Sequence, residues 1–277
     1  MTVFRTNLKR GHKFFISGAM FGFCMARTIA CVMRIVWAIK PQSVSVAIAA
    51  SLFVAVGDVI GYIVNLNFAQ RIIRALHPKV GWHPAFKIAF IAVYSLIAVS
   101  MALLISFTVY SFYTLNPGKR RTARDFQLYG ASYFATVALL PIPLVLGALA
   151  TPRTLVDDFG TGSFRNKIII VLSGTTALAL GAWFRAGTAY MNPRPATDPA
   201  PYQSKACFYI FYFTLEFLVI WGYLVARIDQ RFYVPDKSKG PGDYSRFAGY
   251  EKEVDHTAPV NINGEVVYPI CEGPVVR

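Results

Sequence analysis

The chain has 277 residues, of which 55% are hydrophobic and only 15% are charged, with a formal net charge of +14. Soluble domains carry about a quarter charged residues, so this composition excludes an ordinary soluble fold and is typical of a membrane protein. The positive charge does not indicate nucleic-acid binding, because the Lys and Arg residues lie in short loops beside apolar segments, as in membrane proteins.

The apolar segments predict an all-α fold, a polytopic transmembrane helix bundle. A basic N-terminal segment, residues 1–13, precedes a predicted bundle of residues 14–227 with six spans. Crossing a membrane takes about 20 residues, and apolar runs that are continuous rather than alternating favour helices over a β-barrel. The predicted spans are 14–39, 43–69, 87–113, 126–150, 167–190 and 205–227.

Charged residues inside the spans are the candidate functional residues. Arg27 in the first span, Asp58 in the second and Glu216 in the sixth each lie roughly 17 to 22 Å from the outer end of their span. An unpaired charge at this depth costs about 2.5 to 3.5 kcal/mol, so such residues usually face the bundle interior and find partners. We therefore expect Arg27 to pair with Asp58 or Glu216 in a buried charge clamp.

Polar residues follow one side of the second span. Ser51, Asp58, Tyr62 and Asn65 recur at helical spacing, so they are expected to share one face of that helix.

Two further arginines lie nearer the outer side. Arg34 in the first span and Arg185 in the fifth are each roughly 8 Å from the outer end of their span and have no obvious acidic partner. Two interpretations stay open. The side chains extend to water, or together they bind an anionic headgroup or carboxylate that enters from outside.

The fourth span contains two prolines, Pro141 and Pro143, in the sequence "LLPIPLVL". Each lacks an amide donor and clashes with the preceding helical turn, so a kink is predicted in this span. The kink is either static or a hinge.

Residues 228–277 are rich in Pro, Gly and charge and have no helical apolar period, which predicts a mostly disordered tail. Loop charge indicates the orientation. Fifteen Lys and Arg residues near the membrane fall on the side that holds both chain ends, and seven fall on the other, where the "GKRRTAR" loop is the exception. The positive-inside bias therefore predicts that the N- and C-termini are cytoplasmic.

The residues needed for several chemistries do not occur in the spans. All four His residues lie outside them, which leaves an intramembrane zinc site without His ligands, and Lys205 stands only at the lip of the sixth span, where retinal binding would need a mid-span lysine. The sequence contains no phosphate-binding loop ending in Lys-Ser/Thr, no GxSxG and no HExxH. We expect no catalysis, no cofactor and no metal.

Several ordered blocks resemble a known family. They include "RGHKFFISG", "FGFCMARTIACVMRIVWA", "NLNFAQRIIRALHPKVGWH", "FRAGTAYMNPRP" and "SKACFYIFYFTLE". Together these blocks resemble an uncharacterised family of fungal multi-pass membrane proteins, domain of unknown function 3112, over most of residues 10–235. A more remote similarity, based on the helix plan, the "WFRAGTAY" arginine and a late-helix glutamate, is to the fungal lipid-translocating exporter family.

The resemblance implies a seven-helix plan that here lacks its first helix. Members of the family typically have another hydrophobic segment before the "RGHKF" block, whereas Met1 stands nine residues ahead of Arg10 in this chain. A flank of the bundle would then be exposed, or filled by a partner helix or a second copy in an oligomer.

Three functional hypotheses follow. The first is a transporter or lipid translocator of the plasma membrane or an internal membrane, whose partners are membrane lipids and an anionic small molecule or headgroup. The second is a receptor-like seven-helix sensor that signals through its C-terminal tail, and the third is a non-catalytic structural membrane protein. The first assigns a polar seam to Arg27, Asp58, Glu216, Arg34 and Arg185.

Overall fold

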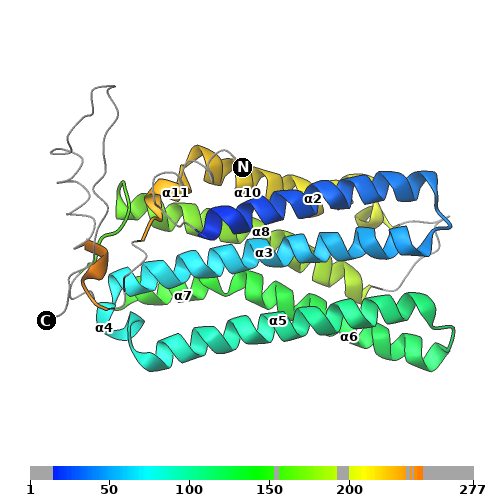
Figure 1. Ribbon diagram of the computed structural model, residues 1–277, viewed down its shortest axis with the longest axis horizontal. Helices are drawn as coiled ribbons and strands as arrows, with labels where there is room; N and C mark the ends of the chain where they lie inside the picture. Colours follow the sequence, from blue (N-terminus) through cyan, green and yellow to red (C-terminus); the bar gives the residue numbers. More distant parts are fainter. Residues whose placement is uncertain (1–14, 153–155, 192–199, 235–237, 239, 246–277) are drawn as a thin grey trace, which may run out of the picture.

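The computed structural model describes residues 15–152, 156–191, 200–234, 238 and 240–245, and every regular element in these ranges is a helix. Six helices or helix pairs are long and apolar enough to cross a membrane (Figure 1). This confirms the predicted all-α, six-span bundle and indicates an integral multi-pass membrane protein. The predicted N-terminal segment 1–13 lies outside the described residues.

The first two helices, α2 (Phe15–Ile39) and α3 (Val44–Leu76), form an antiparallel hairpin with a short turn (Figure 1). Helix α3 ends seven residues beyond the predicted boundary at residue 69. Arg71 and Arg74 made its last two turns resemble a loop, yet both side chains reach backbone or side-chain acceptors nearby. The Nε atom of Arg71 donates to Asn67 Oδ1 at 3.1 Å, and the Nε atom of Arg74 donates to Gly81 O at 3.3 Å.

A short helix, α4 (Pro78–Gly81), leads to a second antiparallel pair, α5 (Pro84–Tyr113) and α6 (Pro117–Leu139) (Figure 1). The Asn116 side chain caps α6 by accepting from the Gly118 amide at 3.0 Å. The "GKRRTAR" segment is therefore the start of a helix. The predicted loop there is wrong, because a helix can begin in water ahead of its apolar part, and the helix begins nine residues before the predicted start of the span at residue 126.

The helix is interrupted between α6 and α7 (Pro141–Ala150), next to the proline pair at which a kink is predicted. Leu140 is the junction, and its amide donates to Thr136 O at 3.0 Å. Pro141 and Pro143 fall in the first turn of α7, where amide groups have no partner within the helix, so the missing donors cost little there. Whether the junction acts as a hinge stays a prediction.

Helix α8 (Phe164–Tyr190) is the fifth span, and the sixth is divided. After η1 (Pro201–Gln203) the chain forms α9 (Lys205–Tyr209), a π-helical turn η2 (Ile210–Thr214) and α10 (Leu215–Val225). The Thr214 hydroxyl donates to Tyr209 O at 3.3 Å, five residues back. This π-turn, which the sequence did not predict, ends two residues before Glu216.

The chain after α10 returns to the bundle, although residues from 228 onward were predicted to be mostly disordered. Helix α11 (Ile228–Arg231) is followed by Phe232, which is fully buried with its ring centroid 4.4 Å from that of Phe68. Tyr244 is 1% exposed, and the Asp157 carboxylate accepts from the Ser245 amide at 2.8 Å. The start of the predicted tail thus packs on the bundle, while residues 246–277 lie outside the described residues.

Candidate functional site

Four charged side chains from four helices meet inside the bundle. Arg27 of α2 donates to Asp58 of α3 and to Glu216 of α10, and its Nη1 atom donates to Val54 O at 3.0 Å. Arg185 of α8 places its Nη1 atom 2.8 Å from Asp58 Oδ1 and 3.4 Å from Glu216 Oε1. We call these four residues the charge cluster. The predicted pairing of Arg27 with the two carboxylates is confirmed by this geometry.

The cluster is buried and contains two basic and two acidic side chains. The exposed fractions of the side chains are 11% for Arg27, 11% for Asp58, 13% for Arg185 and 4% for Glu216. Two guanidinium groups and two carboxyl groups therefore lie together away from water. Breaking such a pair by removing one partner costs about 3 to 5 kcal/mol, because the remaining charge is left uncompensated.

Two glycines allow the four helices to approach. A Cβ atom at Gly57 would lie 3.1 Å from Cζ and Nε of Arg27, so the guanidinium group rests on the bare backbone of α3. A Cβ atom at Gly181 would lie 2.8 Å from the backbone oxygen of Phe211, in the π-turn. Gly181 thus lets η2 contact α8 closely, which places Glu216 beside Arg185.

Aromatic rings cover the apolar sides of the guanidinium groups. The Arg27 Cζ atom lies 5.3 Å from the Phe23 ring centroid and 5.5 Å from that of Phe213, and Arg185 Cζ lies 5.1 Å from that of Tyr212. Cations over aromatic faces are attracted by the ring quadrupole, more strongly where water is excluded. These rings offset part of the cost of removing the arginines from water.

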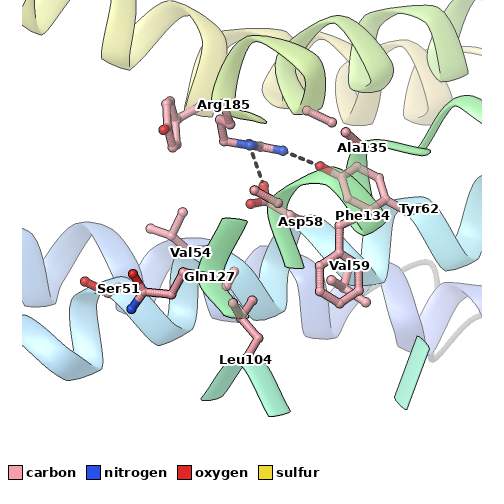
Figure 2. Close-up of a pocket in the computed structure, with 14 residues that line it drawn as sticks. Ser51, Val54, Asp58, Val59, Tyr62, Leu104, Gln127, Phe134, Ala135 and Arg185 are labelled. Atoms are coloured by element: carbon pink, nitrogen blue, oxygen red, sulfur yellow. Dashed lines mark hydrogen bonds and ion pairs between the residues drawn. The ribbon is translucent and has the colours of Figure 1, made fainter. Parts of the chain in front are cut away.

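Arg185 belongs to the charge cluster, contrary to the predicted arrangement in which it lay at an outer level without an acidic partner. Its Nη2 atom also donates to the Tyr62 hydroxyl (Figure 2). The position of Arg185 along the helix axis gives the depth of its backbone and not that of its guanidinium group. Helical side chains lean toward the N-terminus of their helix, so the long Arg185 side chain reaches back along α8 to the level of Asp58.

Arg34 lies outside the cluster but is connected to it by stacked rings. Its Cζ atom is 4.0 Å from the centroid of the Phe208 ring, which stacks on Tyr212 at 4.3 Å, and Tyr212 in turn contacts Arg185. Phe208 and Tyr212 therefore form a chain of ring contacts from Arg34 to Arg185, and binding of one anion by both arginines stays a prediction. Within the part of the chain that the structure describes, the buried Nε atom of Arg34 has no hydrogen-bond partner. Binding of an anion by Arg34 stays a prediction.

A cavity of about 200 Å³ lies beside the cluster, between α3, α5, α6 and α8 (Figure 2). Asp58 and Arg185 line its charged side, and its other polar residues are Ser51, Tyr62, Gln127 and Tyr212. Three of these residues belong to the polar side predicted for the second span, which the cavity therefore confirms. The fourth residue of that predicted side, Asn65, instead accepts a hydrogen bond from Tyr223.

Sequence reasoning missed Gln127 and the π-turn. Gln127 stands at the predicted start of a span, where an amide side chain is ordinary, so nothing local distinguishes it. The only signal was the amide's position one residue inside a long apolar run.

A family model described as "Protein of unknown function (DUF3112)" matches residues 155–233 of this chain. The matched segment contains Arg185 and Glu216, and so it supplies two of the four members of the charge cluster. Over these residues the match supports the resemblance to domain of unknown function 3112. No curated protein and no solved structure matches the chain.

Proposed function

We propose that this protein is a transporter or lipid translocator, and that the charge cluster is the polar part of its substrate path. The observation that carries the proposal is the position of the cluster beside a cavity near the middle of the spans. Asp58 and Arg185 face that cavity from two different helices (Figure 2). A clamp that only held helices together would need no adjacent space.

The free-energy cost of burying these charges also supports the proposed transport function. Each charged residue at mid-depth in a membrane is unfavourable, and replacing a buried ion pair by well-packed apolar residues is often neutral or stabilising. Ionisable residues retained in such positions typically mark substrate or ion pathways. A chain that keeps four of them in contact therefore favours a function beyond stability.

The orientation proposed from loop charge can be expressed on the fold. The connections from α3 to α5 and from α7 to α8, with the segment after α10, would face the cytoplasm together with both chain ends. The turns between α2 and α3 and between α5 and α6 would face outward. The excess of Lys and Arg at the first set of connections supports this orientation. Accessibility labelling of single cysteines in intact cells tests it.

Reconstitution of the full chain into liposomes tests the transport proposal. Headgroup-labelled phosphatidylcholine and phosphatidylserine report lipid movement by loss of fluorescence to an external quencher, and radiolabelled choline, glycerol 3-phosphate and glycerophosphocholine report solute uptake. We expect Arg185→Gln to reduce the rate at least tenfold. The matched control is Arg165→Gln, which changes an exposed arginine on the same helix and leaves the rate unchanged.

Two results would overturn the transport proposal. One is that the wild-type chain moves the two lipids and the three solutes no faster than empty liposomes do. The other is an equal rate for wild type and Arg185→Gln at matched amounts of reconstituted protein, which is the outcome expected of a structural membrane protein.

A receptor-like sensor is the second candidate, favoured by the packing of the chain after α10. The Asp157 carboxylate accepts from the amides of Gly242 at 3.0 Å and Ser245 at 2.8 Å, which ties the start of the C-terminal segment to the bundle. A change in the bundle could thereby move the segment that follows. Removal of residues 246–277 separates the two candidates, because a transporter keeps its rate and a sensor loses its cellular response.

A further inference from the structure

We infer that the cavity beside the charge cluster binds a small zwitterionic group, with one cationic and one anionic centre, that enters from the end where α5 meets α6. This inference rests on the proposed function and specifies its substrate class. The group could belong to a free solute or to a lipid headgroup, since both present the same chemistry to the site.

The equal numbers of basic and acidic groups in the site favour a ligand without net charge. Arg27 and Arg185 are balanced by Asp58 and Glu216 within direct contact distance, so the cluster is electrically neutral when all four groups are ionised. A ligand of net charge would leave an uncompensated charge among apolar helices, which is expensive where water is excluded. A zwitterion adds none and can still form ion pairs.

The lining of the cavity offers one group to each end of such a ligand. Of the four cluster residues, Asp58 and Arg185 line the cavity, whereas Arg27 and Glu216 lie behind them on α2 and α10. The guanidinium group of Arg185 suits a carboxylate or phosphate, and the carboxylate of Asp58 suits an ammonium group. The ligand would exchange part of the ion pair between these two residues for contacts of its own.

The size of the cavity limits the bound part to a small group. Pockets for drug-sized ligands usually occupy about 300 to 1,000 Å³. The cavity beside the cluster has a volume of about 200 Å³, which suits a headgroup or a small solute better than a larger molecule.

A second hollow lies next to the cavity, toward the end of the bundle. It has a volume of about 430 Å³ and shares Ser51, Ala55, Leu104 and Gln127 with the first cavity. Figure 2 shows Ser51, Gln127 and Leu104 together on the side of the first cavity away from Tyr62.

The lining of this hollow makes it the entry route. It continues toward the C-terminal end of α5, where Thr108 and Ser111 add hydroxyl groups and Phe112 adds an apolar wall. The side chain of Gln127 donates to the Ser111 hydroxyl at 3.3 Å across the α5–α6 pair. Polar groups thus follow the route from the α5–α6 turn to Asp58 and Arg185.

Equilibrium binding to the full chain tests the inference. The chain is placed in nanodiscs of phosphatidylglycerol, so that no zwitterionic lipid competes. Three radiolabelled probes of related structure are compared: glycerophosphocholine, which is zwitterionic, choline, which is cationic, and glycerol 3-phosphate, which is anionic. We expect glycerophosphocholine to bind at least tenfold more tightly than either ion. Equal affinity for all three, or binding of none, overturns the inference.

Charge-changing variants give a result that a non-specific site would not give. Asp58→Asn leaves the cluster with one excess positive charge, and Arg185→Gln leaves one excess negative charge. We expect the first variant to prefer glycerol 3-phosphate and the second to prefer choline, with the ratio of the two affinities shifted about a hundredfold between them. Arg165→Gln is the control and keeps the wild-type preference. An unchanged preference in both charge variants overturns the inference.

A variant that leaves the charges unchanged keeps the test informative if the cluster variants do not fold. Gln127→Leu keeps all four charges and removes a polar group from the route, so the association rate constant of glycerophosphocholine is expected to fall about tenfold with the order of preference among the probes unchanged. An unchanged association rate constant would refute the entry route. Adding phosphatidylcholine to the nanodiscs distinguishes the sources, because it competes with the probe only if the site accepts a lipid headgroup.

The inference and the proposed function fail in different ways. Lipid or solute movement in the liposome assay, without a preference for the zwitterionic probe, overturns the inference and leaves transport standing. Binding of the zwitterion without any movement leaves the site standing and overturns transport.

Discussion

Replacing Arg27 tests whether the charge cluster is a balanced unit. In Arg27→Met, Asp58 and Glu216 keep only Arg185 as a cationic partner, and Val54 O loses its side-chain donor. The side chain is 11% exposed, so water does not replace these interactions fully. We expect the free energy of unfolding to fall by about 3 to 5 kcal/mol, the cost of breaking a buried pair from one side.

A second substitution that restores neutrality should recover part of this loss. Glu216→Gln alone is expected to cost about 3 kcal/mol, because it leaves two arginines with one carboxylate. The double variant Arg27→Met with Glu216→Gln has one positive and one negative group left, namely Arg185 and Asp58, which remain 2.8 Å apart. We expect the double variant to be about 3 kcal/mol more stable than the sum of the single effects, near the upper end of measured couplings between contacting residues.

Titration with sodium dodecyl sulfate in mixed micelles measures the free energy of unfolding of the wild type, the two single variants and the double variant. Arg165→Met is the control. It introduces methionine at an exposed arginine of α8 and should not change the unfolding midpoint. Strict additivity of the two single effects would refute the reasoning, since it would mean that Arg27 and Glu216 do not share one balanced site.

Three further predictions concern the surroundings of the site. Gly57→Ala should displace the Arg27 side chain, because the new Cβ atom would lie 3.1 Å from its guanidinium carbon, and should lower the free energy of unfolding by about 1 to 3 kcal/mol; an unchanged micelle-unfolding midpoint would contradict the close approach. Asp157→Ala should free the backbone amides around Tyr244, and limited proteolysis should then cleave near that residue several times faster than in wild type, whereas equal cleavage rates would argue against the capping role. Pro141→Ala should join α6 to α7 by supplying the missing amide donor, and spin labels on the two helices should report a narrower distance distribution if the junction is a hinge; an identical distribution would identify a static kink.

The sequence by itself determined the class of the protein and much of the charge cluster. Apolar length is a local property, so six spans could be recognised without knowing how the helices pack. The high cost of an isolated charge in lipid also made Arg27, Asp58 and Glu216 candidates for mutual pairing before any contact was known. Both arguments depend only on composition and on position within a span.

The tertiary structure decided which groups of different helices meet. Arg185 joined the cluster because its long side chain leans back along α8, and Glu216 reached it through a π-turn that approaches Gly181 closely. The cavity forms where α3, α5, α6 and α8 leave space, and Gln127 contributes to it from a helix whose first turns resembled a loop. Helix tilt, side-chain direction and backbone approach are relations between distant segments, so no local pattern of residues specifies them.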